Sequence, residues 1–376
     1  MTYQVPAPVV PGTRRAGERS ALVHPRVDAW ATGWLAVLIW AFIAVAQALD
    51  VLAESPRWIF WIAAFISATH FAMSYRLAYD TPRVALRTHP IALLWAPATL
   101  AATLAALLIS ASLGSEAAGD GIRSMVTLVF ALTMWHYVKQ AFGVTMIAAR
   151  HAGFAFDRRE RLTLRYGLYP LWAISTLGYL SGRQVVSIAD VDVRTDLLSG
   201  LAGTLRQLLV VTSMVVLVGT LAIAARRARR LPPASVVAPL LAAVLWVGAL
   251  PSAALAVMLL PALHALQYLA CAGRAQHRLL DDEGRAPRVQ TWHVVQIMVA
   301  AGCVGLLVTS SLPIALERAA SPWEGTTLWP VTIFVALNLH HYLIDATVWR
   351  SDGRLVQAVM TERSPVASAL NHTRGR

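Results

Sequence analysis

The chain has 376 residues, of which 57% are hydrophobic and only 14% are charged, and its formal net charge is +12. Soluble domains carry about 25% charged residues, so this composition excludes an ordinary soluble protein and indicates a membrane protein. The positive charge comes from arginine-rich loops without a nucleic-acid-binding motif, so we expect contact with anionic lipid and no nucleic-acid partner. Cys271 and Cys303 lie in apolar runs and predict no disulfide framework.

Residues 1–27 are polar, proline-rich and basic, and they predict a disordered cytoplasmic tail. Apolar segments of about the length that crosses a bilayer follow. We therefore expect an all-α polytopic membrane protein, with about ten transmembrane helices in one bundle over residues 28–350 and a flexible cytoplasmic tail over 351–376. The expected spans are 29–49, 57–77, 91–113, 124–149, 163–181, 205–225, 234–250, 252–273, 292–316 and 326–349.

Loops that are rich in arginine alternate with the other loops between these expected spans. The loops after the even-numbered spans are rich in arginine, whereas the intervening loops are short or lean toward acidic residues. Positive charge collects on the cytoplasmic side of a membrane, so the alternation predicts that both termini are cytoplasmic. The first span has no small-residue cleavage site, so we expect a retained anchor in a bacterial inner membrane.

Five of the eleven histidines fall inside the expected spans, where ionisable side chains are costly and mark functional sites. They occupy the second, fourth, eighth and tenth spans, and each lies about 12 to 15 residues after its span begins. If these four helices run parallel, the imidazoles form one layer in the membrane. The five residues are His70, His136, His264, His340 and His341.

The tenth span adds a carboxylate to this layer. Asn338, His341 and Asp345 share one helix face, because residues three and four apart in a helix are neighbours. His340 points about 100° away from His341, so we expect one of the two to bind a metal and the other to bridge or orient. Tyr268, four residues after His264, is expected to assist the chemistry.

Lys139, the only lysine of the chain, lies one turn beyond His136. Inside a bilayer it could pair with Asp345, bind an anionic substrate head or stabilise negative charge on oxygen. The alternative is that its ammonium group extends to the membrane interface.

Neutral imidazole is the commonest metal ligand, and three or four histidines with a carboxylate suit non-haem iron. We therefore expect a metal-dependent oxidoreductase that acts on a lipophilic substrate, such as an isoprenoid or acyl chain that enters from the bilayer. Three alternatives stay open: a haem held by two facing histidines, a transporter or proton relay that uses the His/Lys/Asp residues, and a structural membrane protein without catalysis. The oligomeric state is not predicted.

Three segments resemble motifs of a known family. Residues 69–74 (T-H-F-A-M-S) are similar to an H-F-G-M stretch, residues 261–277 to a helix end of the pattern P…Y-F-C…R-H, and residues 341–345 to the end of a P-H-x-x-L-I-D motif. These motifs belong to the bacterial Brp/Blh family of integral-membrane carotenoid-cleaving dioxygenases.

This resemblance implies a non-haem iron held by histidines on several helices. His70 and His277 match histidines of the family motifs, and His341 lies within the last motif. The P-H-G-x-x-D motif of the family is absent, and neither His136 nor His264 matches one of its histidines. The resemblance therefore favours a histidine-ligated membrane oxygenase and does not identify the substrate.

Overall fold

The structure is a computed structural model, and it describes residues 25–49, 57–113, 116–180, 187–188, 191–192, 202–248, 254–281, 287–320, 328–350 and 353–360. These residues are almost all helical, which confirms the predicted all-α class. Of the predicted tail over 1–27, residues 1–24 lie outside the described part of the chain. The remaining residues of that tail belong to a helix that begins at Pro25.

The elements follow one another along the chain, with three short π-helical turns (η) set into longer helices. They are α1 (Pro25–Ala29), η1 (Trp30–Trp34), α2 (Leu35–Ala48), α3 (Arg57–Ala78), α4 (Pro82–Thr88), η2 (Ile91–Trp95), α5 (Ala96–Ser112), α6 (Glu116–His151), α7 (Arg158–Gly167), α8 (Tyr169–Leu180), β1 (Ser187–Ile188), β2 (Val191–Asp192), α9 (Ala202–Ala228), α10 (Ala234–Gly248), α11 (Ala254–Asp281), α12 (Pro287–Leu306), η3 (Leu307–Ser311), α13 (Leu312–Ala320), α14 (Leu328–Val348) and α15 (Arg354–Met360). The strands pair antiparallel, with Ser187 opposite Asp192 and Ile188 opposite Val191.

Six helical stretches in the described part of the chain are long and apolar enough to cross a membrane. They coincide with the first, second, third, sixth, ninth and tenth expected spans, so the chain is a polytopic membrane protein, but the predicted count of ten spans is wrong. The six are Val27–Ala48, Trp58–Ala78, Ile91–Ser110, Thr204–Ala228, Val289–Ala319 and Trp329–Val348.

The other four expected spans differ for physical reasons. α6 and α11 are long, but polar residues such as His136 and His264 interrupt their apolar sequences, and neither helix is among the six described candidates. The expected span 163–181 is divided between α7, which is rich in arginine, and α8. α10 is apolar but has only 15 residues, and much of it lies inside the protein, where Val236, Ala238 and Ala242 are fully buried.

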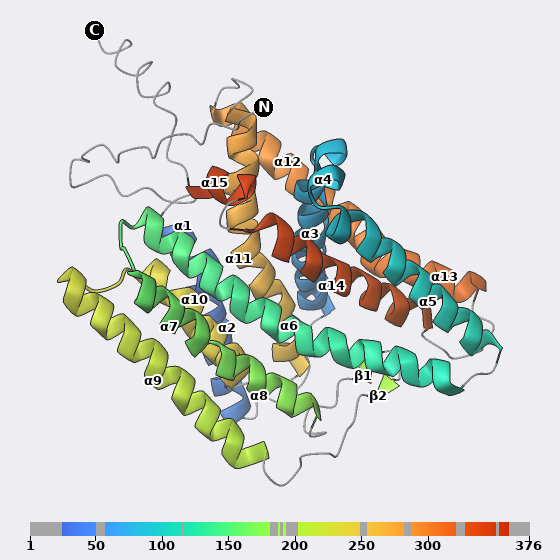
Figure 1. Cartoon of the computed structure of the whole chain (residues 1–376), viewed down its shortest axis with the longest axis horizontal. Coiled ribbons are helices and arrows are strands. Elements are labelled where there is room, and N and C mark those ends of the chain that lie inside the picture. The colour runs from blue at the N-terminus through green and yellow to red at the C-terminus, as the bar shows by residue number, and fades with distance from the viewer. Residues whose placement is uncertain are drawn as a thin grey trace.

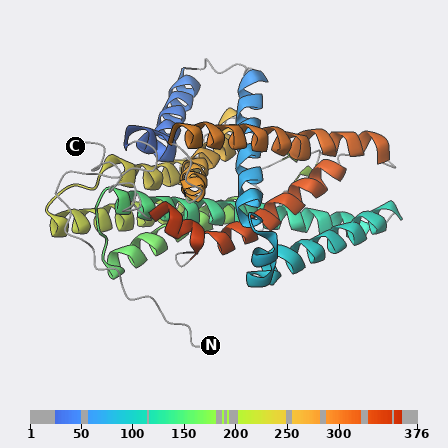
Figure 2. The ribbon, with the colours of Figure 1, turned by 90° about the horizontal axis from the view of Figure 1, so that it is seen from above.

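The helices cross one another rather than form a bundle of parallel rods. α6 runs along the long axis of the molecule in both views, whereas α11 stands upright in Figure 1 and α3 stands upright in Figure 2. α3 packs mainly against α12 and α11, and it also touches α14. The predicted parallel layer is therefore replaced by a crossing point.

The crossing of α3 and α12 depends on two glycines of α12. A Cβ atom on Gly302 would lie 2.5 Å from the hydroxyl oxygen of Thr69, and one on Gly305 would lie 2.3 Å from the carbonyl oxygen of Ala68. The atoms near Gly302 belong to side chains, whereas the nearest atoms at Gly305 are backbone, so glycine is required most strictly at Gly305. Because Ala68 and Thr69 directly precede His70, the contact also positions that histidine.

Apolar side chains fill the space around the crossing helices. The largest core cluster joins α6 to α8, α9, α10 and α11, with Trp246 only 1% exposed. A second cluster contains Met73, Tyr268 and Val359. Val359 belongs to α15, so the predicted flexible tail over 351–376 instead begins with a helix that packs on the core; residues 361–376 lie outside the described part of the chain.

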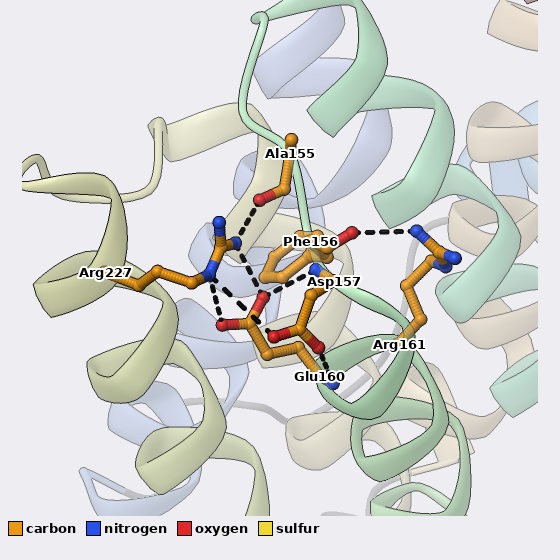
Figure 3. Close-up of polar contacts among 6 residues, drawn as sticks. All are labelled: Ala155, Phe156, Asp157, Glu160, Arg161 and Arg227. Atoms are coloured by element: carbon orange, nitrogen blue, oxygen red, sulfur yellow. Dashed lines mark hydrogen bonds and ion pairs between the residues drawn. The ribbon is translucent and has the colours of Figure 1, made fainter.

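Charged side chains fix the start of α7 (Figure 3). Asp157 and Glu160 form a capping box, in which the side chain of each accepts a hydrogen bond from the backbone N–H of the other, both at 2.8 Å. Arg227, near the end of α9, donates to both carboxylate oxygens of Glu160 at 2.8 Å and to the carbonyl of Ala155. These hydrogen bonds of the Arg227 guanidinium join the loop between α6 and α7 to α9.

We expect Glu160→Gln to lower the free energy of unfolding by about 1 kcal/mol at neutral pH, because the capping box survives but the charge pair with the half-exposed Arg227 is lost. The hydrogen bond from Arg227 lowers the pKa of Glu160 below its ordinary 4.5. The stabilisation is therefore present above pH 4.5 and disappears as the pH falls through the lowered pKa. Thermal unfolding of both proteins from pH 7 to pH 3 measures this difference, and the exposed Asp120→Asn change is the control.

A difference between the wild type and Glu160→Gln that stays constant down to pH 3 would contradict this role of the charge.

Candidate metal centre

Four histidines from four helices converge where the helices cross. They are His70 on α3, His136 on α6, His264 on α11 and His341 on α14, and all are buried. The ring centroids are 4.6 Å apart for His70 and His341, 5.0 Å for His136 and His341, 4.9 Å for His136 and His264, and 6.4 Å for His70 and His136. The structure thus brings together histidines that are up to 271 positions apart in the chain (341 − 70).

Asp345 enters this cluster from α14, one turn after His341. Its Oδ2 atom lies 3.9 Å from Nε2 of His70, 3.6 Å from Nε2 of His136 and 3.5 Å from Nε2 of His341. One donor atom of each of these four residues lies within 4.8 Å of every other. We call His70, His136, His341 and Asp345 the histidine–aspartate group.

These distances suit a shared ion better than direct hydrogen bonds. Good N–H···O bonds have donor–acceptor distances of about 2.7–3.2 Å. Ligand atoms that lie about 2.0–2.2 Å from a tetrahedral ion are separated from one another by about 3.3–3.6 Å. The separations between Oδ2 of Asp345 and the three Nε2 atoms, 3.5 to 3.9 Å, are close to that range.

Five polar side-chain atoms of the group also lack a hydrogen-bond partner in the described chain. Nε2 of His70, Nε2 of His136, both ring nitrogens of His341 and Oδ1 of Asp345 are buried without a hydrogen-bond partner among the described residues. An unsatisfied buried polar group costs about 1–3 kcal/mol, so such groups are rare. A cation would accept lone pairs from the imidazoles and offset the buried carboxylate charge. The residues of the histidine–aspartate group therefore fit a metal ion.

His264 lies beside the histidine–aspartate group rather than in it. Its ring stacks on Tyr137 with 4.0 Å between centroids, and its backbone carbonyl accepts a hydrogen bond from Gln140 at 2.9 Å. Its nitrogens are not among the mutually close donor atoms of the group. The structure therefore places this predicted ligand next to the group.

His340 is turned away from the group. Its Nε2–H donates to the carbonyl of Ala92 at 3.1 Å, and its Nδ1 accepts from the hydroxyl of Tyr75 at 3.0 Å. The Ala92 carbonyl lies in the π-helical turn η2, and Pro97, five residues later, has no N–H to bond it. His340 thus replaces a missing backbone donor, and of the predicted pair only His341 belongs to the group.

Lys139 lies outside the group as well. Its ammonium group sits 4.0 Å from the ring centroid of Trp135, one turn back on α6, in a cation–π contact. The ion pair with Asp345, one of the options that the sequence left open for Lys139, is not formed among the described residues. Tyr268, in contrast, is close to the group, with its ring centroid 4.3 Å from that of His70.

A polar network connects the helices behind the cluster. Gln267 donates to the carbonyl of Thr32 at 2.6 Å, and Gln140 donates to the side-chain oxygen of Gln267 at 3.4 Å. These bonds join η1, α6 and α11. In the sequence, both glutamines lie three or four residues after a histidine, and this spacing could have identified them. No sequence pattern indicated Thr32.

The sequence placed Asn338 on the face of His341, and in the structure its side chain bonds residues of α14 outside the group. Its Oδ1 accepts from the hydroxyl of Tyr342 at 3.0 Å, and that hydroxyl lies 2.6 Å from Oγ1 of Thr133. The Tyr342 ring centroid is 5.0 Å from that of His136. Asn338 and Tyr342 therefore join α14 to α6 behind His136. Phe71, whose ring centroid lies 4.7 Å from that of His341, was not anticipated either.

Fold and site together define an all-α polytopic membrane protein with a buried cluster of three histidines and one aspartate. Comparisons with protein-family models, curated proteins and solved structures found no match to this chain.

Proposed function

We propose that this membrane protein binds one transition-metal ion through the histidine–aspartate group and uses it for oxidative chemistry on a lipophilic substrate. The observation that carries the proposal is the approach of three Nε2 atoms, from α3, α6 and α14, to one buried carboxylate oxygen. Structural hydrogen bonds alone do not explain this arrangement, because the distances are long and the three Nε2 atoms have no hydrogen-bond partner in the described chain.

Non-haem iron is the ion that the donor set favours. Imidazole and carboxylate together are typical of iron sites that react with dioxygen, whereas cysteine thiolates are absent from the group. When bound, iron would supply one-electron redox chemistry at this position. A haem fits less well, because a porphyrin between two of the imidazoles would collide with the others.

The protein's own residues define the surroundings of the ion. His70, His136 and His341 hold it, and Asp345 offsets part of its charge inside the apolar core. Burial excludes bulk water, since the four residues are at most 8% exposed. The ring of Phe71 lies against His70 and His341 and provides an apolar contact.

The position of these ligands supports a lipophilic substrate. His70 and His341 belong to two of the helices that are apolar enough to cross a membrane, Trp58–Ala78 and Trp329–Val348. Leu343, two residues after His341, is 44% exposed on the outside of α14. We therefore propose an isoprenoid or acyl chain, which would approach the site from the bilayer. The arginine pattern supports a bacterial inner membrane with both termini cytoplasmic.

Oxygen uptake tests the proposed activity. The protein is purified in detergent, loaded anaerobically with Fe(II), placed in nanodiscs of bacterial lipid extract and exposed to air. We expect oxygen consumption and oxidised lipid detectable by mass spectrometry. His136→Ala should reduce the rate at least about 100-fold, because it removes a ligand rather than a supporting contact. His293→Ala, a change on α12 outside the group, is the matched control.

Iron-loaded wild-type protein that consumes no more oxygen than the iron-free protein, in lipid and in added polyene, would count against the oxidative function. Protein that never retains a metal would count against the whole proposal and would favour the proton or ion relay.

A further inference from the structure

Neither the histidine–aspartate group nor any hydrogen bond within the described residues accounts for the ring of His264. The side chain is 2% exposed, and both Nδ1 and Nε2 lack a partner there. A neutral imidazole has one N–H donor and one acceptor lone pair, and proteins rarely bury both unsatisfied. This ring therefore indicates a partner that is not part of the chain.

Contacts with neighbouring residues fix the position of the His264 ring. Tyr137 stacks on it at 4.0 Å with 26° between the planes, and the edge of Trp246 supports Tyr137 at 6.2 Å. Gln140 holds the backbone of α11 at His264 itself. Because these contacts are made by fully or partly buried side chains, His264 cannot swing toward the other histidines without breaking the stack.

The fixed ring lies close to the histidine–aspartate group but outside its set of donor atoms. Its centroid is 5.1 Å from that of His70 and 4.9 Å from that of His136. Direct ligation of the same ion needs a nitrogen about 2.0–2.1 Å from it. A ring held next to two ligand rings, with its own nitrogens outside the group, is placed to contact something bound beside the ion.

We infer that His264 donates a hydrogen bond to a small exogenous ligand, such as water or azide, that binds next to the ion of the histidine–aspartate group. The inference rests on the proposed function, since it requires the ion. It assigns His264 a role different from the metal ligation expected from the sequence. His264 then selects ligands that present an acceptor atom to the buried site.

Azide binding tests this role by a readout independent of turnover. The protein is loaded with iron and oxidised in air, and azide is titrated while its charge-transfer absorption with ferric iron is followed. We expect His264→Phe, which keeps a ring against Tyr137, to retain iron but bind azide about 10- to 100-fold more weakly, the loss expected for a charge-assisted hydrogen bond. His264→Gln, which restores an N–H donor, should recover part of this affinity.

The outcomes separate this inference from the proposed function. Loss of iron in both His264 variants would show that His264 is a ligand and would overturn the inference. Unchanged azide affinity in His264→Phe with full iron content would overturn it too. If His70→Ala retained as much iron as the wild type, the histidine–aspartate group would not be the metal site and both proposals would fail. If His264→Phe does not fold, the same comparison is made with His264→Gln against His264→Leu.

Discussion

Replacing His341 with alanine is expected to remove the bound metal from the purified protein, whereas the same change at the neighbouring His340 is expected to leave it bound. His341 directs Nε2 to within 3.5 Å of Oδ2 of Asp345. His340 instead uses both ring nitrogens for Tyr75 and Ala92. Metal per protein chain, measured by mass spectrometry after purification in detergent, should fall at least about 10-fold for His341→Ala only.

His340→Ala is a stringent control because the residue type, the helix and the depth are the same. It should lower the free energy of unfolding by about 1–3 kcal/mol, since the Ala92 carbonyl loses its donor. Equal metal content in the two variants, high or low, would contradict the assignment of His341, and not His340, as a metal ligand.

A single methyl group at Gly305 is expected to have the second large effect. In Gly305→Ala the added Cβ would meet the carbonyl oxygen of Ala68 at 2.3 Å, and backbone atoms cannot move aside as a flexible side chain can. α3 and α12 must then separate, which costs about 1–3 kcal/mol in a tightly packed interface. Because His70 follows two residues after Ala68, metal content should fall together with the unfolding temperature.

Gly219→Ala is the matched control for this change. Gly219 lies inside α9, and a Cβ there would have no neighbour within 4 Å, so alanine should leave the site intact and strengthen the helix by up to about 1 kcal/mol. If Gly305→Ala behaved like Gly219→Ala in thermal unfolding and metal content, the close approach of α3 and α12 would not position His70.

Local patterns were sufficient to predict much of the site. Histidines interrupt apolar helical runs, and such costly residues mark the helices that carry polar chemistry. The spacing of His341 and Asp345 places both on one helix face, and the structure keeps them together. The same periodicity showed that His340 and His341 could not both face the group. It could not show which faced inward, because that depends on Ala92 and Tyr75 from distant parts of the chain.

Contacts between helices that are distant in the chain could not be predicted from the sequence. The approach of α3 to α12 depends on Gly305 meeting Ala68, and no local pattern encodes a contact between them. Parallel helices were therefore expected where crossing helices occur. The count of ten spans was wrong for a related reason: α10 is an apolar helix largely buried inside the protein, and hydropathy alone does not distinguish a buried helix from one that faces lipid.

Metal-edge X-ray absorption on the purified protein would show directly whether the histidine–aspartate group holds a metal. We expect one metal ion per chain, surrounded by three imidazole nitrogens and one carboxylate oxygen at about 2.0–2.2 Å, with the multiple-scattering pattern of imidazole reduced in His70→Ala. A metal coordinated by sulfur, a spectrum unaltered by His70→Ala or Asp345→Ala, or protein that binds no metal under any loading condition would contradict this expectation.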